Sequence, residues 1–219
     1  MKKMLIINLK AYEEGTGHEA LKIAKIAESF AGKDAEIVLA VQQADIKIIV
    51  DSVGIPVFSQ HVDPIGYGAH TGWTLPESIK QAGASGTLIN HSERRIDFET
   101  LEKSVKRCRE LGLVTVACAD TPENAEKIAE FGPDYIAIEP PELIGGEVSV
   151  SKAKPQIITE SVKRVKQFGI PVLCGAGIKN REDVKKAKEL GVGGILVASG
   201  VVKSKDSRKA IRDLLEGLR

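Results

Sequence analysis

Lys10, His91 and Glu139 each stand at or just after the end of a short apolar run. A carboxylate in a dry pocket can take a proton from carbon. A neutral imidazole and an ammonium can stabilise the oxyanion that then develops on the neighbouring carbonyl oxygen. These three residue types suit proton transfer next to a carbonyl group, provided that the fold brings them together.

Glycine-containing turns follow the last two apolar runs, as Gly175-Ala176-Gly177 and Ala198-Ser199-Gly200. Backbone N–H groups in such turns and at helix N-termini bind phosphate dianions. The combination indicates a small phosphorylated carbonyl compound as the substrate.

Each of these features also has an ordinary structural interpretation. Lys10 alone could be a solvated surface lysine, and His91 alone could be a structural or helix-capping residue. Glu139 could be an isolated carboxylate, although an acidic residue so deep in an apolar run is unusual. The segment 93–95, Glu-Arg-Arg, fits a solvated first helical turn or an ion-pair network that orients the site. His18, His61 and His70 fit structural or surface positions.

The elements that must position these residues are short apolar runs that alternate with longer amphipathic segments. Most runs lack polar alternation, which is typical of parallel strands covered on both faces. We expect strands over residues 4–8, 36–41, 55–59, 86–90, 114–118, 135–139, 171–174 and 194–197.

A helical segment follows each expected strand, and the one near 44–53 is weak. Thr16 with Glu19 and Thr74 with Glu77 fit capping boxes, and Thr121 and Asn180 fit helix N-caps.

Eight serial βα units predict an α/β fold, a closed (β/α)₈ barrel that forms a single domain over 1–219. An open doubly wound sheet is the alternative, but no Gly-x-Gly-x-x-Gly follows the first strand and no Walker A motif occurs. In a barrel the carboxyl ends of all strands meet at one face, where active sites lie. That face would then hold Lys10, His91 and Glu139 together with Asn8, Gln60, His61, Asn90 and Glu93.

Composition excludes several classes of function. The 219 residues carry a net charge of +1, which gives no electrostatic case for nucleic acid or an anionic membrane. No apolar run approaches the roughly 20 residues that span a bilayer, and the run 4–7 is too short for a signal peptide. We expect a cytoplasmic protein.

Cys108, Cys118 and Cys174 are widely spaced, which predicts reduced, buried thiols and no zinc site.

Five segments together resemble triosephosphate isomerase, in its short archaeal-type form, over essentially the whole chain. They are Asn8-Leu9-Lys10, Asn90-His91-Ser92-Glu93-Arg94-Arg95, Ile138-Glu139-Pro140-Pro141-Glu142-Leu143-Ile144-Gly145, Cys174-Gly175-Ala176-Gly177-Ile178 and Val197-Ala198-Ser199-Gly200-Val201-Val202.

The resemblance implies a TIM barrel that interconverts dihydroxyacetone phosphate and D-glyceraldehyde 3-phosphate through an enediol(ate), in glycolysis and gluconeogenesis. Such an enzyme is an intramolecular aldose-ketose isomerase without metal or organic cofactor. Glu139 resembles the base, His91 the neutral electrophile that shuttles protons between oxygens, and Lys10 the cation that offsets phosphate and enediolate charge. Asn8 would bind substrate and help to hold Lys10.

The resemblance also implies a lid and a phosphate site. Ile144 and its glycine neighbours would form the lid, which excludes water from the enediolate. Gly177, Ala198 and Ser199 would offer backbone donors to the phosphate. The lid segment Pro140-Pro141-Glu142 and the Gly-Ala-Gly-Ile loop depart from the pattern of longer family members, as does the shorter chain.

Compact members of the family are commonly tetramers, and the longer ones are dimers. The resemblance therefore implies a homo-oligomer, with a tetramer favoured and a dimer possible. The segment 66–73 resembles the loop that docks near a neighbour's active site, although it could also be a flexible exposed loop.

Two rival functions are also compatible with the sequence. A phosphate-binding barrel aldolase could use Lys10 as a Schiff-base nucleophile, which borohydride would trap. A noncatalytic barrel could bind phosphorylated ligands or a protein partner, but the presence of Glu139, His91 and Lys10 together argues against it.

Overall fold

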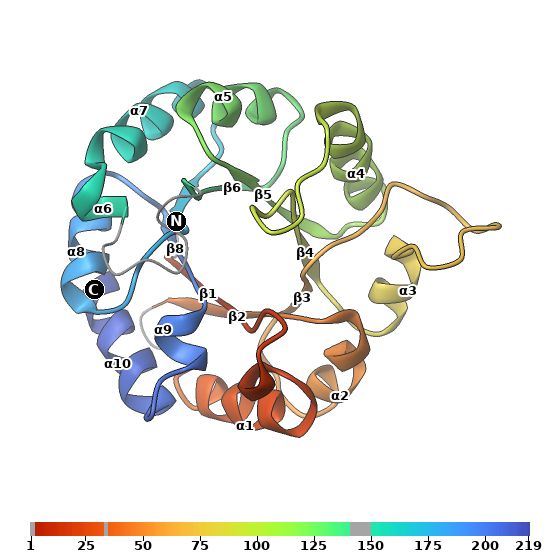
Figure 1. Cartoon of the computed structure of the whole chain (residues 1–219), viewed down its shortest axis with the longest axis horizontal. Coiled ribbons are helices and arrows are strands. Elements are labelled where there is room, and N and C mark those ends of the chain that lie inside the picture. The colour runs from red at the N-terminus through yellow and green to blue at the C-terminus, as the bar shows by residue number, and fades with distance from the viewer. Residues whose placement is uncertain (1–2, 33–34, 141–149) are drawn as a thin grey trace.

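A closed barrel of eight parallel strands forms the centre of the molecule (Figure 1). The structure, a computed structural model, describes residues 3–32, 35–140 and 150–219. Each strand pairs with the next one in the chain, and β8 pairs with β1 to close the barrel. The strands are β1 Met4–Asn8, β2 Glu36–Val41, β3 Val57–Ser59, β4 Gly86–Ile89, β5 Val114–Ala119, β6 Tyr135–Ile138, β7 Val172–Cys174 and β8 Gly194–Val197.

Helices form a ring around the barrel (Figure 1). They are α1 Gly17–Glu28, α2 Ile46–Val50, α3 Pro76–Gln81, α4 Phe98–Glu110, α5 Pro122–Glu130, α6 Val150–Ala153, α7 Pro155–Val165, α8 Arg181–Glu189, α9 Ser199–Val202 and α10 Ser207–Leu218. Short 3-10 turns lie at Glu13–Gly15, Gln43–Asp45 and Lys166–Phe168. The predicted (β/α)₈ fold is confirmed.

Two apolar layers explain why the strands lack polar alternation. Alternate residues of each strand, such as Ile6 and Val38, fill the inside of the barrel together with Phe58 and Leu196. Their sequence neighbours, such as Leu5, point outward into the larger core between the barrel and the helices. A strand that is buried on both faces needs apolar residues at every position.

The predicted strand ends are close to those observed, and the differences have local causes. β3 begins at Val57 and not at residue 55, since Pro56 has no N–H for the ladder. β4 stops before Asn90, whose φ is +60°.

Of the four helix-capping predictions, two are confirmed and two are wrong. Thr121 and Asn180 accept hydrogen bonds from the N–H groups three residues later, as predicted. The capping box at Thr16 is wrong, because its hydroxyl donates to the carbonyl of Tyr12 at 2.8 Å. The box at Thr74 is also wrong: α3 begins at Pro76 without a side-chain cap.

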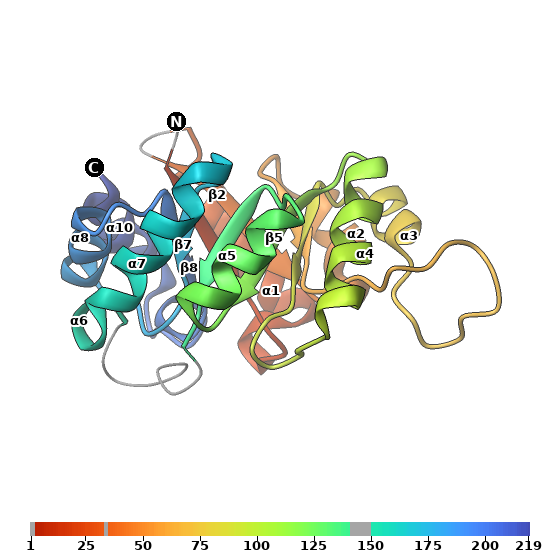
Figure 2. The same ribbon diagram turned by 90° about the horizontal axis from the view of Figure 1, so that it is seen from above.

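The connection between β3 and α3 is a long loop that projects away from the barrel (Figure 2). Tyr67 and Trp73 in this loop are 72% and 56% exposed. Within the three described ranges, no helix is both long enough and apolar enough to cross a membrane.

Candidate active site

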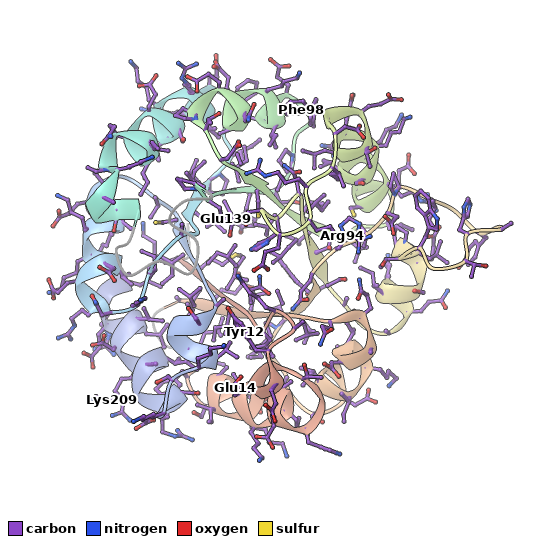
Figure 3. All side chains as sticks on the ribbon, viewed as in Figure 1. Tyr12, Glu14, Arg94, Phe98, Glu139 and Lys209 are labelled. Atoms are coloured by element: carbon purple, nitrogen blue, oxygen red, sulfur yellow. The ribbon has the colours of Figure 1, made fainter. Side chains whose placement is uncertain are left out.

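A pocket at the carboxyl ends of the strands brings the predicted site residues together. Its walls include Asn8, Lys10, His91, Glu139, Gly177, Ala198 and Ser199, contributed by the ends of β1, β4, β6, β7 and β8. Glu139 and Tyr12, both labelled in Figure 3, lie inside the ring of helices and line this pocket. Ile144, the predicted lid residue, lies outside the described residues.

Lys10 is held at three points. Its backbone has a φ of +52°, which is uncommon for a residue other than glycine and marks local strain. Its N–H donates to Asn8 Oδ1 at 3.0 Å, and its carbonyl accepts from Gln60 Nε2 at 3.0 Å. Its Nζ donates to Glu93 Oε1 at 2.8 Å. Asn8 therefore holds Lys10, and Glu93 belongs to the site's charge network.

The side chain of Asn90 stabilises the turn that positions His91. It has the second positive φ among the described residues other than glycine. Its Nδ2 donates to the carbonyl of Cys118 at 2.9 Å, and its Oδ1 accepts from the N–H of Ile96 at 3.0 Å. The amide side chain thus ties the strained turn to β5 and to the segment that leads into α4.

His91 is buried, and its two ring nitrogens face different groups. Nδ1 accepts a hydrogen bond from the N–H of Glu93 at 3.2 Å. An acceptor nitrogen carries no hydrogen, so this bond assigns the imidazole hydrogen to Nε2. Nε2 lies 3.4 Å from Glu139 Oε1. The ring therefore presents an N–H donor to the pocket.

Glu139 follows β6 and is 2% exposed. Its backbone N–H donates to the carbonyl of Ala119 at 2.8 Å, and its Oε2 has no hydrogen-bond partner within the described part of the chain. Gly175 makes room for the side chain: a Cβ there would lie 2.6 Å from Glu139 Cγ. A buried carboxylate with an uncommitted oxygen is suited to take up a proton.

Cys118 of β5 lies beside Glu139. Burial raises the pKa of its thiol well above the ordinary value, and the neighbouring Glu139 carboxylate, to which it is hydrogen-bonded, raises it further. Cys118 is thus a neutral neighbour of Glu139. Cys108, Cys118 and Cys174 are all free and buried, as predicted.

The comparison with known proteins decides the family. The model of the family described as triosephosphate isomerase matches residues 3–214. The chain belongs to the triosephosphate isomerase family. The triosephosphate isomerase of Methanocaldococcus jannaschii is 46% identical over 216 residues, which are 97% of this chain and 99% of that relative. The triosephosphate isomerase of Archaeoglobus fulgidus is 47% identical over 220 residues, 98% of this chain and 99% of the relative.

A triosephosphate isomerase from Methanothermus fervidus is 44% identical over 215 residues, which cover 97% of each chain. The resemblance that the sequence motifs indicate is therefore confirmed, and this member of the triosephosphate isomerase family is an isomerase enzyme.

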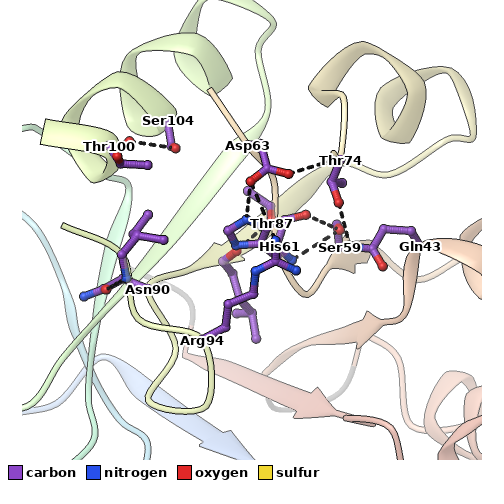
Figure 4. A network of polar contacts seen from close by, with 12 residues as sticks. Gln43, Ser59, His61, Asp63, Thr74, Thr87, Asn90, Arg94, Thr100 and Ser104 are labelled. Carbon is purple, nitrogen blue, oxygen red and sulfur yellow. Dashed lines mark hydrogen bonds and ion pairs between the residues drawn. The ribbon is translucent and has the colours of Figure 1, made fainter. Parts of the chain in front are cut away.

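His61, at the end of β3, belongs to a second polar cluster beside the pocket (Figure 4). Its Nε2 lies 3.0 Å from Asp63 Oδ1, and Asp63 Oδ2 accepts from the N–H of Thr74 at 2.6 Å. Arg94 Nη2 lies 3.7 Å from Asp63 Oδ1. These contacts join the two ends of the projecting loop, which agrees with the structural role predicted for His61.

The surroundings of the His61 cluster shift both pKa values downward. Burial lowers the pKa of His61, and the charge of Arg94 adds to this against the opposing effect of Asp63. Burial of Asp63 acts to raise its pKa, but the hydrogen bonds from Thr74 and His61 outweigh this effect, so the pKa of Asp63 is lowered.

Sequence reasoning gave no role to five residues that line the pocket, namely Tyr12, Ile178, Lys179, Leu196 and Val197. Tyr12 and Lys179 each stand two residues beyond a predicted site residue, so proximity along the chain was the available signal. Among the described residues, no group of three His, Cys, Asp or Glu side chains could hold a metal ion.

Proposed function

We propose that this chain interconverts dihydroxyacetone phosphate and D-glyceraldehyde 3-phosphate by proton transfer through an enediol(ate), at the pocket that contains Glu139, His91 and Lys10. The observation that carries the proposal is the buried carboxylate of Glu139, with an uncommitted oxygen, 3.4 Å from the Nε2 of His91. Family membership supports the same reaction. The whole chain, 1–219, acts as one barrel domain.

Glu139 is the base. Its carboxylate removes a proton from the carbon beside the carbonyl, and the released electron pair forms the double bond of the enediolate while charge moves to the carbonyl oxygen. Glu139 then returns the proton to the neighbouring carbon.

His91 is the electrophile. Its Nε2–H donates a hydrogen bond to the oxygen on which negative charge develops, and it then moves a proton between the two oxygens of the enediolate. The hydrogen bond from the N–H of Glu93 to Nδ1 keeps the donor hydrogen on the pocket side of the ring. A fixed donor that is aimed at developing charge needs no reorganisation during the reaction.

Lys10 supplies positive charge to the substrate phosphate and to the enediolate, and Asn8 binds substrate while it holds the Lys10 backbone. Glu93 is a positioning residue, because its carboxylate holds the Lys10 ammonium at 2.8 Å and its N–H orients His91. One residue thus aligns two catalytic groups through its side chain and its backbone.

The phosphate group binds on the backbone N–H groups of Gly177, Ala198 and Ser199. These residues precede or begin α8 and α9 and line the pocket. The resemblance assigns Ile144, which lies outside the described residues, to substrate binding in a lid. No metal ion or organic cofactor takes part in this scheme.

The enzyme works as a homo-oligomer in the cytoplasm, with a tetramer favoured over a dimer. The exposed Tyr67 and Trp73 of the β3–α3 loop support an interface there, because isolated chains rarely expose large aromatic groups on one projecting loop. Size-exclusion chromatography with light scattering gives the number of subunits.

The aldolase alternative requires a free amine on Lys10, whereas its Nζ is hydrogen-bonded to the Glu93 carboxylate. Borohydride trapping with a triose phosphate distinguishes the two reactions, since a stable adduct on Lys10 would contradict the isomerase. A coupled assay with glyceraldehyde 3-phosphate tests the proposal itself. Turnover to dihydroxyacetone phosphate supports it, and its absence in the folded enzyme contradicts it.

A further inference from the structure

Lys179 is a charged side chain of the pocket that has no role in the scheme above. It lies in the loop between β7 and α8, two residues after Gly177, and lines the pocket together with Gly177, Ala198 and Ser199. Lys179 is exposed, and its ammonium forms no ion pair within the described part of the chain. Its charge is therefore available to a ligand.

The backbone of Lys179 is fixed by the first turn of α8. Its N–H donates to Asp183 Oδ2 at 3.0 Å, and the N–H of Asp183 donates to Asn180 Oδ1 at 3.0 Å. Asp183 is 4% exposed, so these bonds are shielded from water. The long side chain of Lys179 consequently starts from a fixed point at the edge of the pocket.

Close packing at Gly200 places the backbone of Lys179 next to the start of α9. A Cβ on Gly200 would lie 3.1 Å from the carbonyl oxygen of Ile178 and 3.3 Å from the Cα of Lys179. A larger residue would push the β7–α8 loop away from α9. Glycine at position 200 thus lets Lys179 stand beside Ala198 and Ser199, which the proposed function assigns to phosphate binding.

The other lysines near this part of the pocket are already engaged. Lys10 is hydrogen-bonded to the Glu93 carboxylate at 2.8 Å. Lys203, which follows α9, lies 4.5 Å above the centre of the Tyr12 ring. In the proposed function Lys10 serves the enediolate as well as the phosphate, so part of the charge of the phosphate dianion is left for a second ammonium on a flexible stem to offset.

We propose that Lys179 is a substrate-binding residue whose ammonium contacts the phosphate group of the triose phosphate. The inference rests on the proposed function, and it adds a cation to the phosphate site from the β7–α8 loop. The phosphate keeps its charge throughout the reaction, so we expect this contact to be equally strong in the substrate and in the transition state. It therefore acts on KM and on salt dependence, and hardly on kcat.

Three variants test the inference. Lys179→Met removes the charge and keeps an unbranched side chain, whereas Lys179→Arg keeps a cation. Lys185→Met is the control, since Lys185 is exposed on the neighbouring α8 and pairs with Glu182 at 3.2 Å, away from the pocket. For each variant, steady-state kinetics with glyceraldehyde 3-phosphate are measured over a range of salt concentrations. Calorimetry gives the Kd of inorganic phosphate.

We expect Lys179→Met to raise KM and the phosphate Kd about three- to tenfold, as for a charge-assisted contact at the edge of a pocket. We expect kcat to stay near the wild-type value and the salt dependence of kcat/KM to weaken. Lys179→Arg should restore most of the affinity, and Lys185→Met should change neither constant.

Unchanged KM and phosphate Kd in Lys179→Met would overturn the inference, and so would an equal effect in Lys185→Met. A fall in kcat with wild-type phosphate affinity would also overturn it. Because phosphate binding is measured without turnover, the inference is tested even if the wild-type enzyme fails to convert triose phosphates. That failure would contradict the proposed function instead.

Discussion

A buried histidine follows each of the strands β3 and β4 at the same end of the barrel, but the two imidazoles face different carboxylates. His61 and His91 are 4% and 8% exposed. The partner of His61 is Asp63, and both oxygens of that carboxylate have polar partners. The partner of His91 is Glu139, whose Oε2 has no hydrogen-bond partner in the described ranges.

The difference shows that burial and carboxylate contact do not by themselves make a reactive histidine. Hydrogen bonds to both oxygens stabilise the charged form of Asp63 and make it a poor base. Asp63 and His61 are suited to holding the β3–α3 loop. Glu139 keeps an oxygen that can accept a proton, and the pocket lies beside it. Of these two pairs, His91 and Glu139 have the geometry that the proposed proton transfer requires.

The largest expected effect comes from Glu139→Gln, which keeps the shape of the side chain and removes the base. We expect kcat to fall about a thousandfold or more, because a positioned base contributes two to four orders of magnitude. Steady-state assays measure this, and circular dichroism checks the fold. Asp63→Asn is the matched change in the other pair, and it should keep most of the activity. Wild-type turnover in Glu139→Gln would remove Glu139 from the role of base.

The next largest effect is expected from His91→Gln. Loss of one aimed donor to a developing oxyanion costs about two to three orders of magnitude in kcat. KM should change far less, because the donor acts mainly in the transition state. A variant whose KM rises while kcat is retained would show that His91 only binds substrate.

For His61→Asn we expect a loss of stability while kcat is retained, in contrast to the loss of kcat expected for His91→Gln. The variant should unfold more easily by about 1–3 kcal/mol, since the buried Asp63 carboxylate loses a hydrogen-bond partner. Its kcat should stay close to that of the wild type under conditions in which it is folded. Urea unfolding monitored by circular dichroism measures the loss. A large fall in kcat without a loss of stability would contradict the distinction between the two histidines.

The smallest expected effect is a pH dependence of stability that belongs to His61. Its pKa in the folded protein lies below the ordinary value of 6.5, chiefly because of burial. Between those two pKa values the unfolded chain binds more protons, so stability falls as pH is lowered below about 6.5. The dependence should flatten in His61→Asn. Urea unfolding at several pH values measures the dependence. If stability changed with pH equally in the wild type and in His61→Asn, the pH dependence would belong to other groups.

Much of the fold follows from local pattern. Strands 4–8, 36–41 and 194–197 have the predicted bounds, because uninterrupted apolar runs fit a strand that is buried on both faces. Eight such units fix a barrel, and the barrel brings Lys10, His91 and Glu139 to one pocket. The resemblance to a known family adds their proposed roles.

The rest depends on contacts that are distant in the sequence. The partners of Asp63 include Thr74, eleven residues away across the projecting loop, and α3 begins at Pro76 without the predicted cap at Thr74. The hydrogen position on His91 depends on a turn in which Asn90 has a positive φ. The place of Lys179 depends on packing against Gly200. The first two features have no local sequence signal, and for Lys179 the available signal was its proximity to Gly177 along the chain.

The most direct measurement of the central claim follows the proton itself. Triose phosphate is incubated in heavy water with wild type, Glu139→Gln or His61→Asn, and proton NMR measures deuterium at the carbon beside the carbonyl. We expect deuterium incorporation with the wild type and with His61→Asn, and almost none with Glu139→Gln. Incorporation by Glu139→Gln at the wild-type rate would contradict it.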